Sequence, residues 1–597
     1  MSTEQLLALA LSLNPGFWVI ACAPFALVAR GGFQRSLALI GPPILALLIM
    51  LYPPAEVSSG TAVLGFLGLE ISLYRTDSLS LIFALGFVLA AVLGGIYSLH
   101  RRDRLQDAAG LVYAGAAIAA VFAGDLVTLA VCWELTALAS SLLVFASGGR
   151  DSLPAGMRYL MMQILSGVLL ISGVAMTGLA EGSFILSEIG RLRDGVLVGV
   201  FDLDAPGTLL ILAAVGIKAG FPLVHTWLQD AYPNTTETGA VVMSAYTTTL
   251  AVYVLARGFA GLDALIWIGA VMTIYPIFFA VVENDLRKVL AFSTNNQIGF
   301  MVCAVGVGTP LALNGAAAHA VAHIVFKGLL FMAMGAVWMR TGSTRATDLG
   351  GLHRTMPFTA LFCLIGAASI SALPLLSGFA SKSMIMSSVH SGEGLMLVWL
   401  MLLFASAGVL EHSGIKIPYF AFFSHDSGRR PEEAPFNMLL AMGLSAGLCL
   451  SIGISPAWFY ELLPYRDVAR EYLVQDLFTL EHILTQLQLL AFAVLAFLLL
   501  KRAGLYPPEA PGIILDVDWV WRRGWPLAAG PVRAPVLGVL RSVAAAGRDV
   551  LGRVGAIMAE IFSPAGALAS RASAVSGAVW AVALLGIVVI ISVVSLT

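Results

Sequence analysis

The sequence predicts an all-α polytopic membrane protein with about 16 transmembrane helices. Hydrophobic residues make up 59% of the 597-residue chain, charged residues make up 11%, and the mean hydropathy is +0.90. Soluble domains carry roughly 25% charged residues. Apolar runs near the length of about 20 residues that a spanning helix needs recur along the whole chain. They predict spans over 4–28, 37–53, 77–99, 107–122, 124–147, 158–180, 207–227, 238–257, 262–282, 287–306, 311–338, 356–386, 395–422, 436–457, 483–500 and 577–596.

The distribution of basic residues predicts the orientation of these spans. Most of the 33 Lys and Arg residues fall in alternate loops, for example around Arg101, Arg150 and Arg287, and loops of this kind stay in the cytoplasm. Both termini are therefore expected outside. Residues 1–18 lack the basic start and the small-residue cleavage site of a signal peptide, so they are expected to begin the first span. The chain is predicted to be a multi-pass protein of the bacterial inner (cytoplasmic) membrane, embedded in the lipid bilayer.

The composition also excludes several classes of partner and cofactor. The formal net charge of −2 is unfavourable for a nucleic-acid partner, because phosphate binding requires a basic surface. The five cysteines stand singly in apolar segments without a CxxC pair, so disulfides, iron–sulfur clusters and zinc sites are not expected. No nucleotide, haem or flavin motif is present, and we predict no cofactor and no metal.

Ionisable residues inside the predicted spans are the candidate functional residues. Each costs at least ~2.5–3.5 kcal/mol on insertion scales, so it needs a partner, water or a function. The histidines and the lysine of span 311–338 recur every four residues and line one helix face. The candidates for proton transfer are Glu134, Lys218, His319, His323, Lys327 and Lys382, and the candidate accessory residues are His225, Asp230, Glu411, His412 and Lys416.

Proton carriage gives each of these residue types a physical use. A nearby carboxylate that moves can switch a desolvated lysine between holding and releasing a proton, which makes Glu134 and Lys218 a candidate switch. Histidines can pass a proton through either ring nitrogen, so His319 and His323 are candidate relays. Two alternatives remain open. Glu134 and Lys218 can form a static ion pair, and the paired histidines can bind a metal, although no carboxylate or cysteine completes a ligand set.

Helix-breaking residues recur in two spans that carry a lysine. Gly220 and Pro222 follow Lys218, and Pro374 and Gly378 precede Lys382, in the related stretches "IKAGFPL" and "LLSGFASK". The two spans lie an odd number of crossings apart, so equivalent segments would cross the membrane in opposite senses. This arrangement is typical of inverted repeats with discontinuous helices, whose unwound backbone lines a cavity.

Four ordered motifs carry a resemblance to a known family. "KAGFPLVHTWLQDAYPNTTETGAVVMSA", "ENDLRKVLAFSTNNQIGFM", "HAVAHIVFKGLLFMAMGA" and "PLLSGFASK" resemble the antiporter-like membrane subunits of respiratory complex I, energy-converting hydrogenases and multisubunit Mrp-type Na+/H+ antiporters. The similarity covers about 75–500. The stretches "SGIKIPYFAFFSHDSG" and "LDVDWVWRRG" are most similar to the D-type subunits of the Mrp antiporters.

The resemblance implies a fold and a set of site residues. It implies two inverted five-helix repeats with broken helices 7 and 12. Glu134 matches the helix-five glutamate, Lys218 and Lys382 match the lysines of helices seven and twelve, and the residues of span 311–338 match the helix-eleven relay. One position departs from the pattern, because Thr249 stands where the family usually has a lysine or histidine. A hydroxyl holds water but stores no proton near neutral pH, so Thr249 is a further accessory candidate.

The resemblance also implies a division of the chain. We expect N-terminal transmembrane helices over 1–100, a first antiporter-like repeat over 101–260, a second, inverted repeat over 261–425 and C-terminal core helices over 426–502. A cytoplasmic segment over 503–576 and a final transmembrane helix over 577–597 would follow. Within that segment, Arg541, Arg548 and Arg553 recur at helical spacing among apolar residues, which fits an amphipathic interfacial helix; a simple linker is the alternative.

The expected function is proton translocation within a multisubunit cation/proton antiporter, with Na+ as the expected cation and other membrane subunits as partners. Two alternatives remain open. One is a proton-pumping subunit of a redox-driven complex I-like or hydrogenase complex, in which case the chain would belong to an enzyme, an NADH-quinone oxidoreductase-like complex. The other is a proton-conducting partner of an inorganic-carbon uptake complex. The sequence does not decide among these assemblies.

Overall fold

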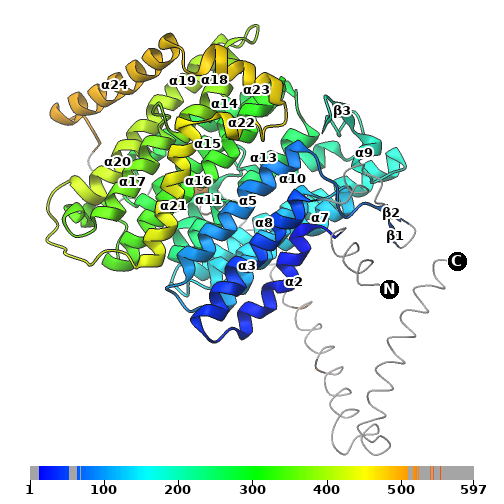
Figure 1. The fold of residues 1–597 in the computed structure, drawn as a ribbon, viewed down its shortest axis with the longest axis horizontal. Helices are drawn as coiled ribbons and strands as arrows, with labels where there is room; N and C mark the ends of the chain where they lie inside the picture. Colours follow the sequence, from blue (N-terminus) through cyan, green and yellow to red (C-terminus); the bar gives the residue numbers. More distant parts are fainter. Residues whose placement is uncertain are drawn as a thin grey trace, which may run out of the picture. The chain divides into compact units, whose positions relative to one another are not determined.

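The computed structural model describes residues 13–52, 64–66, 69–507, 515–520 and 522, with 538, 542 and 552 as isolated residues. The chain divides into two compact units, 1–64 with 70–514 and 65–69 with 515–597. The first unit contains nearly all described elements (Figure 1). The predicted final span over 577–596, the amphipathic segment near 534–565 and the first residues of the chain lie outside the described residues, apart from the isolated positions.

The described part of the chain is an all-α, multi-pass membrane protein. It contains eleven helices that are long and apolar enough to cross a membrane, and shorter apolar helices at 15–28, 208–219 and 357–370. The N-terminal elements are α2 (Pro15–Val28), α3 (Gly32–Leu51), β1 (Leu64–Phe66), β2 (Leu69–Ile71), α5 (Ser78–Ser98), α6 (Arg104–Val121), α7 (Leu126–Phe145), α8 (Ser152–Glu181), α9 (Leu186–Ile189), β3 (Arg191–Arg193) and β4 (Val196–Val198). Strands β3 and β4 pair antiparallel.

The remaining elements follow in the same largely helical pattern. They are α10 (Thr208–Ala219), α11 (Thr226–Ala231), η1 (Tyr232–Asn234), α12 (Glu237–Met243), α13 (Thr247–Gly258), α14 (Asp263–Val282), α15 (Leu286–Val307), α16 (Pro310–Thr341), η2 (Ala346–Asp348), η3 (Leu352–Arg354), α17 (Pro357–Ile370), α18 (Ser377–His390), α19 (Met396–Val409), η4 (Leu410–Ile415), α20 (Lys416–Pro418), η5 (Tyr419–Phe423), α21 (Phe436–Ile454), α22 (Ala457–Tyr460), α23 (Arg466–Tyr472), η6 (Leu473–Leu477) and α24 (Leu480–Arg502). The elements η4, η5 and η6 are π-helical.

Helices α15 and α16 form the centre of the first unit. The most apolar stretches of both helices are completely buried, whereas only 11% of the corresponding stretch of α24 is buried. Helix α16 packs against α5, α12, α15, α17, α18 and α21. Because α15 is surrounded by protein on all sides, it can carry the consecutive polar residues 293–297.

Two predicted spans are interrupted by turns. The helix of span 207–227 ends at Ala219, and α11 begins only at Thr226. Gly220 and Leu223 have φ of +77° and +76° in this first break. The helix of span 356–386 ends at Ile370, and α18 begins at Ser377. Positive φ is strained for a residue with a side chain. Leu223 at the first break and Ala372 and Leu375 at the second have such φ values, so the surrounding packing must hold them in this conformation.

A third interruption lies in the predicted span 238–257, where the sequence analysis expected a continuous helix. Helix α12 ends at Met243, and α13 begins at Thr247. The Tyr232 hydroxyl donates a hydrogen bond to the Met243 carbonyl oxygen at 3.0 Å. This contact satisfies a carbonyl that the interruption exposes.

Ionic contacts connect the basic residues that were expected on one side of the membrane with acidic residues of neighbouring loops. We call this side of the first unit the arginine-rich face. Its ion pairs include Arg35 with Asp107, Arg101 with Glu237 and Arg158 with Asp230. Arg287 is buried there and donates to backbone carbonyl oxygens of residues 232–236. Asp77 binds Arg75 and Arg257.

Candidate functional site

Lys218 lies in the last turn of α10, directly before the first break. Its side chain is fully buried. The Nζ atom donates to the Trp133 carbonyl oxygen at 2.7 Å and to Thr136 Oγ1 at 2.8 Å, and it lies 4.1 Å from the centre of the Trp133 ring. Two oxygen acceptors and a ring face are the partners that a buried ammonium requires. Helix α7 therefore supplies the binding site of Lys218.

Glu134 also comes from α7, but it does not bind Lys218 in an ion pair. The two residues are close enough for an electrostatic interaction, yet every ammonium contact described for Lys218 goes to Trp133 or Thr136. The Glu134 carboxylate lies against Gly167 of α8, where an added Cβ atom would overlap Oε1. It borders an apolar groove of about 450 Å³ between α7 and α8. The static ion pair is therefore not present in this structure, and the switch remains a prediction.

The polar residues of α15 lead from the first break toward α16. Asn295 lies against Gly220, where a Cβ atom would come within 2.5 Å of Oδ1, and its amide donates to the Tyr275 hydroxyl. The ring of His225, at the start of α11, packs 4.6 Å from the Tyr275 ring. Gln297, two residues after Asn295, has its Oε1 atom 3.1 Å from His319 Nε2 and accepts a hydrogen bond from it. Helix α15 therefore connects the first break to His319 of α16.

The three titratable residues of α16 are fully buried and differ in their partners. His319 contacts Gln297 and, through Nδ1, Ser381 Oγ at 2.9 Å. Both ring nitrogens of His323 and the Nζ atom of Lys327 make no hydrogen bond to the described part of the protein. Buried polar groups almost always have a protein or water partner, and an unpaired buried charge is costly. His323 and Lys327 therefore mark positions where water is needed.

Lys382 lies in α18, directly after the second break. Its Nζ atom donates to the Ile370 carbonyl oxygen at the end of α17, at 3.1 Å, and lies 4.8 Å from the centre of the Phe300 ring. It also lines a cavity of about 400 Å³ together with His390, Asp476 and His482. A cavity of this size holds several waters, so Lys382 has an aqueous neighbourhood that the tightly enclosed Lys218 lacks.

Four of the accessory candidates have partners of their own. Asp230 binds Arg158 at the arginine-rich face, with 2.5 and 2.9 Å between oxygen and nitrogen atoms. Glu411 accepts a hydrogen bond from the Tyr506 hydroxyl. His412 Nδ1 lies 2.6 Å from the Gly408 carbonyl oxygen, and Lys416 Nζ donates to the Val281 carbonyl oxygen at 2.5 Å. Glu411 and His412 lie in a π-helical turn, a feature frequent at functional sites.

Thr249 lies in α13, close after the interruption of that span. The residue is fully buried, and its hydroxyl makes no hydrogen bond to the described residues. The neighbouring Thr248 hydroxyl shares this property. Two adjacent unsatisfied hydroxyls favour bound water at this point of the helix.

Several residues of the site did not emerge from the sequence analysis. Trp133 and Thr136 hold Lys218, Gln297 and Ser381 hold His319, and the Ile370 carbonyl holds Lys382. The five consecutive polar residues at 293–297 inside a predicted span were a signal that could have identified Gln297. The sequence contained no signal for the Trp133 and Ile370 carbonyl groups that bind the lysines, because every residue has a backbone carbonyl.

The central part of the chain is similar to a known protein family. The family model described as "NADH:quinone oxidoreductase/Mrp antiporter, TM" matches residues 123–410. The matched region contains Lys218, Lys382, the α16 residues and both helix breaks, so the candidate site lies within the part of the chain that the family model describes.

Curated relatives extend the similarity beyond this region. Hydrogenase-4 component B of Escherichia coli is 29% identical over 64% of this chain and 62% of its own length. The A-type subunit of the Na+/H+ antiporter of Alkalihalophilus pseudofirmus is 29% identical over 65% of this chain and 53% of its own length. The D-type subunit of the Bacillus subtilis Na+/H+ antiporter is 25% identical over 67% of this chain and 83% of its own length. The chain thus spans between half and two thirds of the length of the first two of these relatives.

A solved structure shares the fold. A chain of the Mrp complex from Dietzia superposes with a TM-score of 0.69 at 21% identity, covering 79% of this chain and 98% of the other. At this level of identity the likeness is one of fold. That protein is part of a multisubunit membrane complex.

Proposed function

We propose that the chain is a proton-translocating subunit of a multisubunit cation/proton antiporter of the Mrp type, with Na+ as the cation and a D-type position in the complex. Protons would move along Lys218, His319, His323, Lys327 and Lys382. The Glu134 carboxylate would favour the protonated form of Lys218 when it lies close to the ammonium. Similarity to antiporter subunits of both the A and the D type supports the assembly, and the coverage of 83% of a D-type subunit supports the D-type position.

The observation that carries this proposal is the pair of unsatisfied groups on α16. His323 and Lys327 are fully buried without a protein hydrogen bond in the described part of the chain. A purely structural core would pair such groups or replace them with apolar residues, because each unsatisfied group costs about 1–3 kcal/mol. Groups that carry protons need water as a hydrogen-bond partner, because water can accept and return a proton. His323 and Lys327, unpaired within the described part of the chain, therefore support a hydrated proton path.

The positions of the two lysines support an inverted repeat. Lys218 lies two residues before the first break, whereas Lys382 lies five residues after the start of the helix that follows the second break. In repeats that cross the membrane in opposite senses, such mirrored positions place both lysines at similar depth. This is the basis for proposing repeats over 101–260 and 261–425.

We place the chain in the bacterial inner membrane among other membrane subunits. Helix α24 exposes large apolar side chains on several sides, among them Leu484, Phe492 and Leu498. Such a surface is stable only against lipid or other membrane helices. The arginine-rich face would lie toward the cytoplasm.

A proton-pumping subunit of a redox-driven complex is a second candidate function. The family description includes NADH:quinone oxidoreductase, and a hydrogenase component is among the relatives. In such a complex the same proton path would be driven by a conformational change in a partner instead of a cation gradient. The chain would then be a subunit of an enzyme.

The test uses everted membrane vesicles from a strain in which the gene is deleted and complemented with variants, so that the whole complex is present. Proton movement is followed by a pH-sensitive dye after addition of Na+, of K+, or of NADH. Wild-type vesicles should respond to Na+. Lys218→Ala and Glu134→Ala should lose the response while the complex still assembles, as judged by native gel electrophoresis.

A surface lysine provides the matched control. Lys288 lies at the arginine-rich face and pairs with Glu283 at 3.0 Å, so Lys288→Ala should keep the wild-type response. A response to NADH without any response to Na+ would favour the redox-driven complex. Full exchange in Lys218→Ala would contradict proton transfer through this chain.

A further inference from the structure

An apolar groove lies between α2 and α3, at the N-terminal end of the described chain. The two helices pack side by side at the edge of the first unit (Figure 1). The groove has a volume of about 590 Å³, and its described lining comes from residues 22–29 and 34–45. This volume is within the range of about 300–1,000 Å³ that small-molecule sites occupy.

Large apolar side chains line the groove and face away from the protein. Phe25 is 63% exposed, Val28 is 67% exposed and Leu37 is 61% exposed. Between them, the groove is bordered by the small residues Ala38 and Gly41. A contiguous apolar surface of this kind is stable only against lipid or another membrane helix. The groove therefore requires an apolar occupant.

The backbone of both helices contributes to the open space. Pro24 lies within α2, and Pro42 and Pro43 lie within α3. A proline inside a helix removes a backbone hydrogen bond and bends the helix. Beside Pro42, a Cβ atom at Gly41 would contact only the Leu37 side chain, at 3.4 Å. The groove thus depends on bent helices and on a missing side chain, and not on one rotamer.

The depth of the groove matches one leaflet of a bilayer. The groove begins at the loop between the two helices and extends along α3 from Gln34 to Leu45. At 1.5 Å per residue this segment is roughly 16 Å long, about half of the ~30 Å hydrocarbon core. A helix of another subunit would cross the whole core, whereas a lipid occupies one leaflet. The depth therefore favours a lipid.

Two polar side chains stand at the mouth of the groove. Gln34 Oε1 accepts hydrogen bonds from the amides of Arg30 and Gly31 at 3.1 and 3.4 Å, which leaves the Gln34 amide group as a donor. The exposed Arg30 side chain makes no hydrogen bond or ion pair within the described part of the chain. The described lining contains no acidic residue. These two donors favour an anionic head group.

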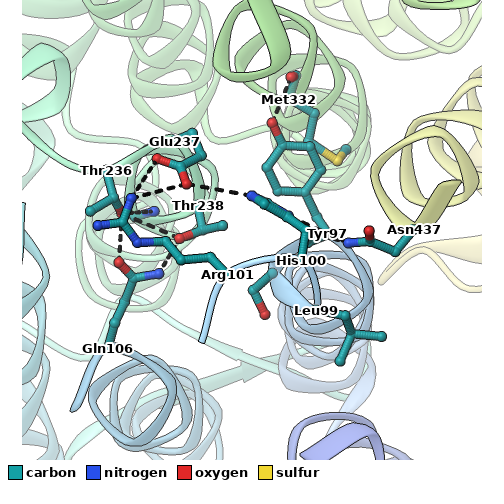
Figure 2. A network of polar contacts seen from close by, with 12 residues as sticks. Tyr97, Leu99, His100, Arg101, Gln106, Thr236, Glu237, Thr238, Met332 and Asn437 are labelled. Atoms are coloured by element: carbon teal, nitrogen blue, oxygen red, sulfur yellow. Dashed lines mark hydrogen bonds and ion pairs between the residues drawn. The ribbon is translucent and has the colours of Figure 1, made fainter. Parts of the chain in front are cut away.

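Other arginines of the arginine-rich face are already neutralised. Arg35 binds both oxygens of the buried Asp107 carboxylate, at 2.6 and 2.9 Å. Figure 2 shows Arg101 reaching the Glu237 carboxylate, with 3.1 Å from its Nη1 atom to each oxygen. Arg30 differs from both because its charge is uncompensated beside an apolar groove.

We propose that the groove between α2 and α3 binds one anionic phospholipid from the leaflet at the arginine-rich face. An acyl chain lies between Phe25 and Leu37, and the phosphate accepts hydrogen bonds from Arg30 and Gln34. The inference goes beyond the proposed function and does not depend on it. The groove lies outside residues 123–410 and contains none of the candidates for proton transfer.

Photochemical labelling of the whole complex tests the site. The complex is reconstituted in nanodiscs of equal parts phosphatidylglycerol and phosphatidylcholine, one of which carries a photoactivatable group on its acyl chain. Labelled peptides are located by mass spectrometry. In the wild type, phosphatidylglycerol should label residues 22–45 about five times more than phosphatidylcholine, the preference expected from one arginine near an anionic lipid. Arg30→Gln should remove this preference.

Variants that fill the groove test the place of the acyl chain. Gly41→Leu should reduce labelling of residues 22–45 by both lipids about tenfold, as expected when about two methylene groups of the chain are no longer buried. Leu37→Trp narrows the groove from its exposed wall and replaces Gly41→Leu if that variant does not assemble. Neither substitution should change the assembly of the complex on native gels.

Gly447→Leu and Arg150→Gln are the matched controls. Nothing lies within 4 Å of the Cβ position of Gly447. Arg150 is exposed, and its side chain has no partner within the described part of the chain. Both variants should keep the wild-type labelling of residues 22–45 and the preference for phosphatidylglycerol.

The possible results decide between a lipid and a protein occupant. Equal labelling by the two lipids in the wild type would overturn the anionic head group. Unchanged labelling in Gly41→Leu and Leu37→Trp would overturn the groove as the site. Labelling that is absent from residues 22–45, together with a chemical cross-link from this segment to another subunit, would show a protein occupant and overturn the proposal. None of these results bears on the proposed function, which Lys218→Ala tests.

Discussion

The two helix breaks differ in the group that binds the carbonyl oxygen exposed at each break. At the first break, Trp227 Nε1 donates to the Ile217 carbonyl oxygen at 2.9 Å, which also accepts the Gly220 amide. At the second break, the Lys382 ammonium itself donates to the Ile370 carbonyl oxygen. A change in the charge of Lys382 therefore acts directly on a helix end, whereas Lys218 can change charge while its helix end stays bound.

The two lysines also differ in their access to water. Lys382 lines a cavity of about 400 Å³, while Lys218 is enclosed by Trp133 and Thr136. The difference indicates a division of tasks under the proposed function. The second break would exchange protons with the cavity that Lys382 lines, and the first break would hold a proton in the closed site between Trp133 and Thr136.

The largest effect is expected from truncating the lysines themselves. Lys218→Ala and Lys382→Ala should each reduce proton movement at least about 100-fold, the low end of the contribution of a positioned proton carrier. Lys382→Ala should in addition lower the stability of the purified complex by about 1–3 kcal/mol more than Lys218→Ala, because a buried carbonyl loses its partner. The volume removed is the same in both. Thermal unfolding in detergent measures the difference, and equal losses of stability would remove the distinction between the breaks.

A smaller effect is expected from displacing Glu134. A Cβ atom at Gly167 would overlap Glu134 Oε1, so Gly167→Ala should push the carboxylate away from α8 and reduce proton movement about tenfold. Gly447→Ala is the control, because nothing lies within 4 Å of its Cβ position and the change should only favour the helix by up to about 1 kcal/mol. Unchanged transport in Gly167→Ala would mean that the position of Glu134 does not matter.

A still smaller effect on transport, together with a loss of stability, is expected from removing the Trp227 indole, which binds the Ile217 carbonyl oxygen at the first break. Trp227→Phe removes the indole donor to Ile217 and should destabilise the complex by about 1–3 kcal/mol, with a smaller loss of transport. Trp267→Phe, at a position where the side chain is 48% exposed, is the control for the loss of indole volume. If the two variants unfold at the same temperature, the Ile217 carbonyl does not depend on Trp227.

The smallest effect is expected from Thr249→Lys. An added ammonium near the path would oppose protonation of the neighbouring lysines, so the same protonated fraction would need a higher proton concentration. The pH optimum of proton movement should therefore move to lower pH, by about one unit. Thr249→Val removes only the hydroxyl and serves as the control. An unchanged pH profile in Thr249→Lys would place this position off the path.

Features that depend on residue type over short stretches could be predicted from the sequence. Gly220 and Pro222 predict an interruption near Lys218, and the helix does end at Ala219. The i, i+4, i+8 spacing predicts that the α16 residues share a face, and all three are buried within one continuous helix. The interruption between α12 and α13 was not predicted, because residues 241–249, "VVMSAYTTT", contain neither Gly nor Pro.

Partners far apart in the sequence could not be predicted in the same way. Asp230 was an accessory candidate for proton transfer, but it binds Arg158, 72 residues earlier in the chain. Glu134 was expected to be the partner of Lys218, yet the neighbouring Trp133 carbonyl and Thr136 hydroxyl bind the ammonium. Such choices depend on the rotation of α7 relative to α10, which local sequence patterns do not encode.

The sequence by itself determined that this protein lies in a membrane, that ionisable residues lie within its apolar spans, and that two of its helices break beside a lysine. These properties follow from hydropathy and from the backbone preferences of glycine and proline, which act over a few residues. Only the tertiary structure decided which oxygen atoms each lysine binds, because these contacts form between helices that are distant in the chain or lie on opposite sides of a break. The physical reason is that every buried polar group must be satisfied by whatever group the packing of the helices brings within reach.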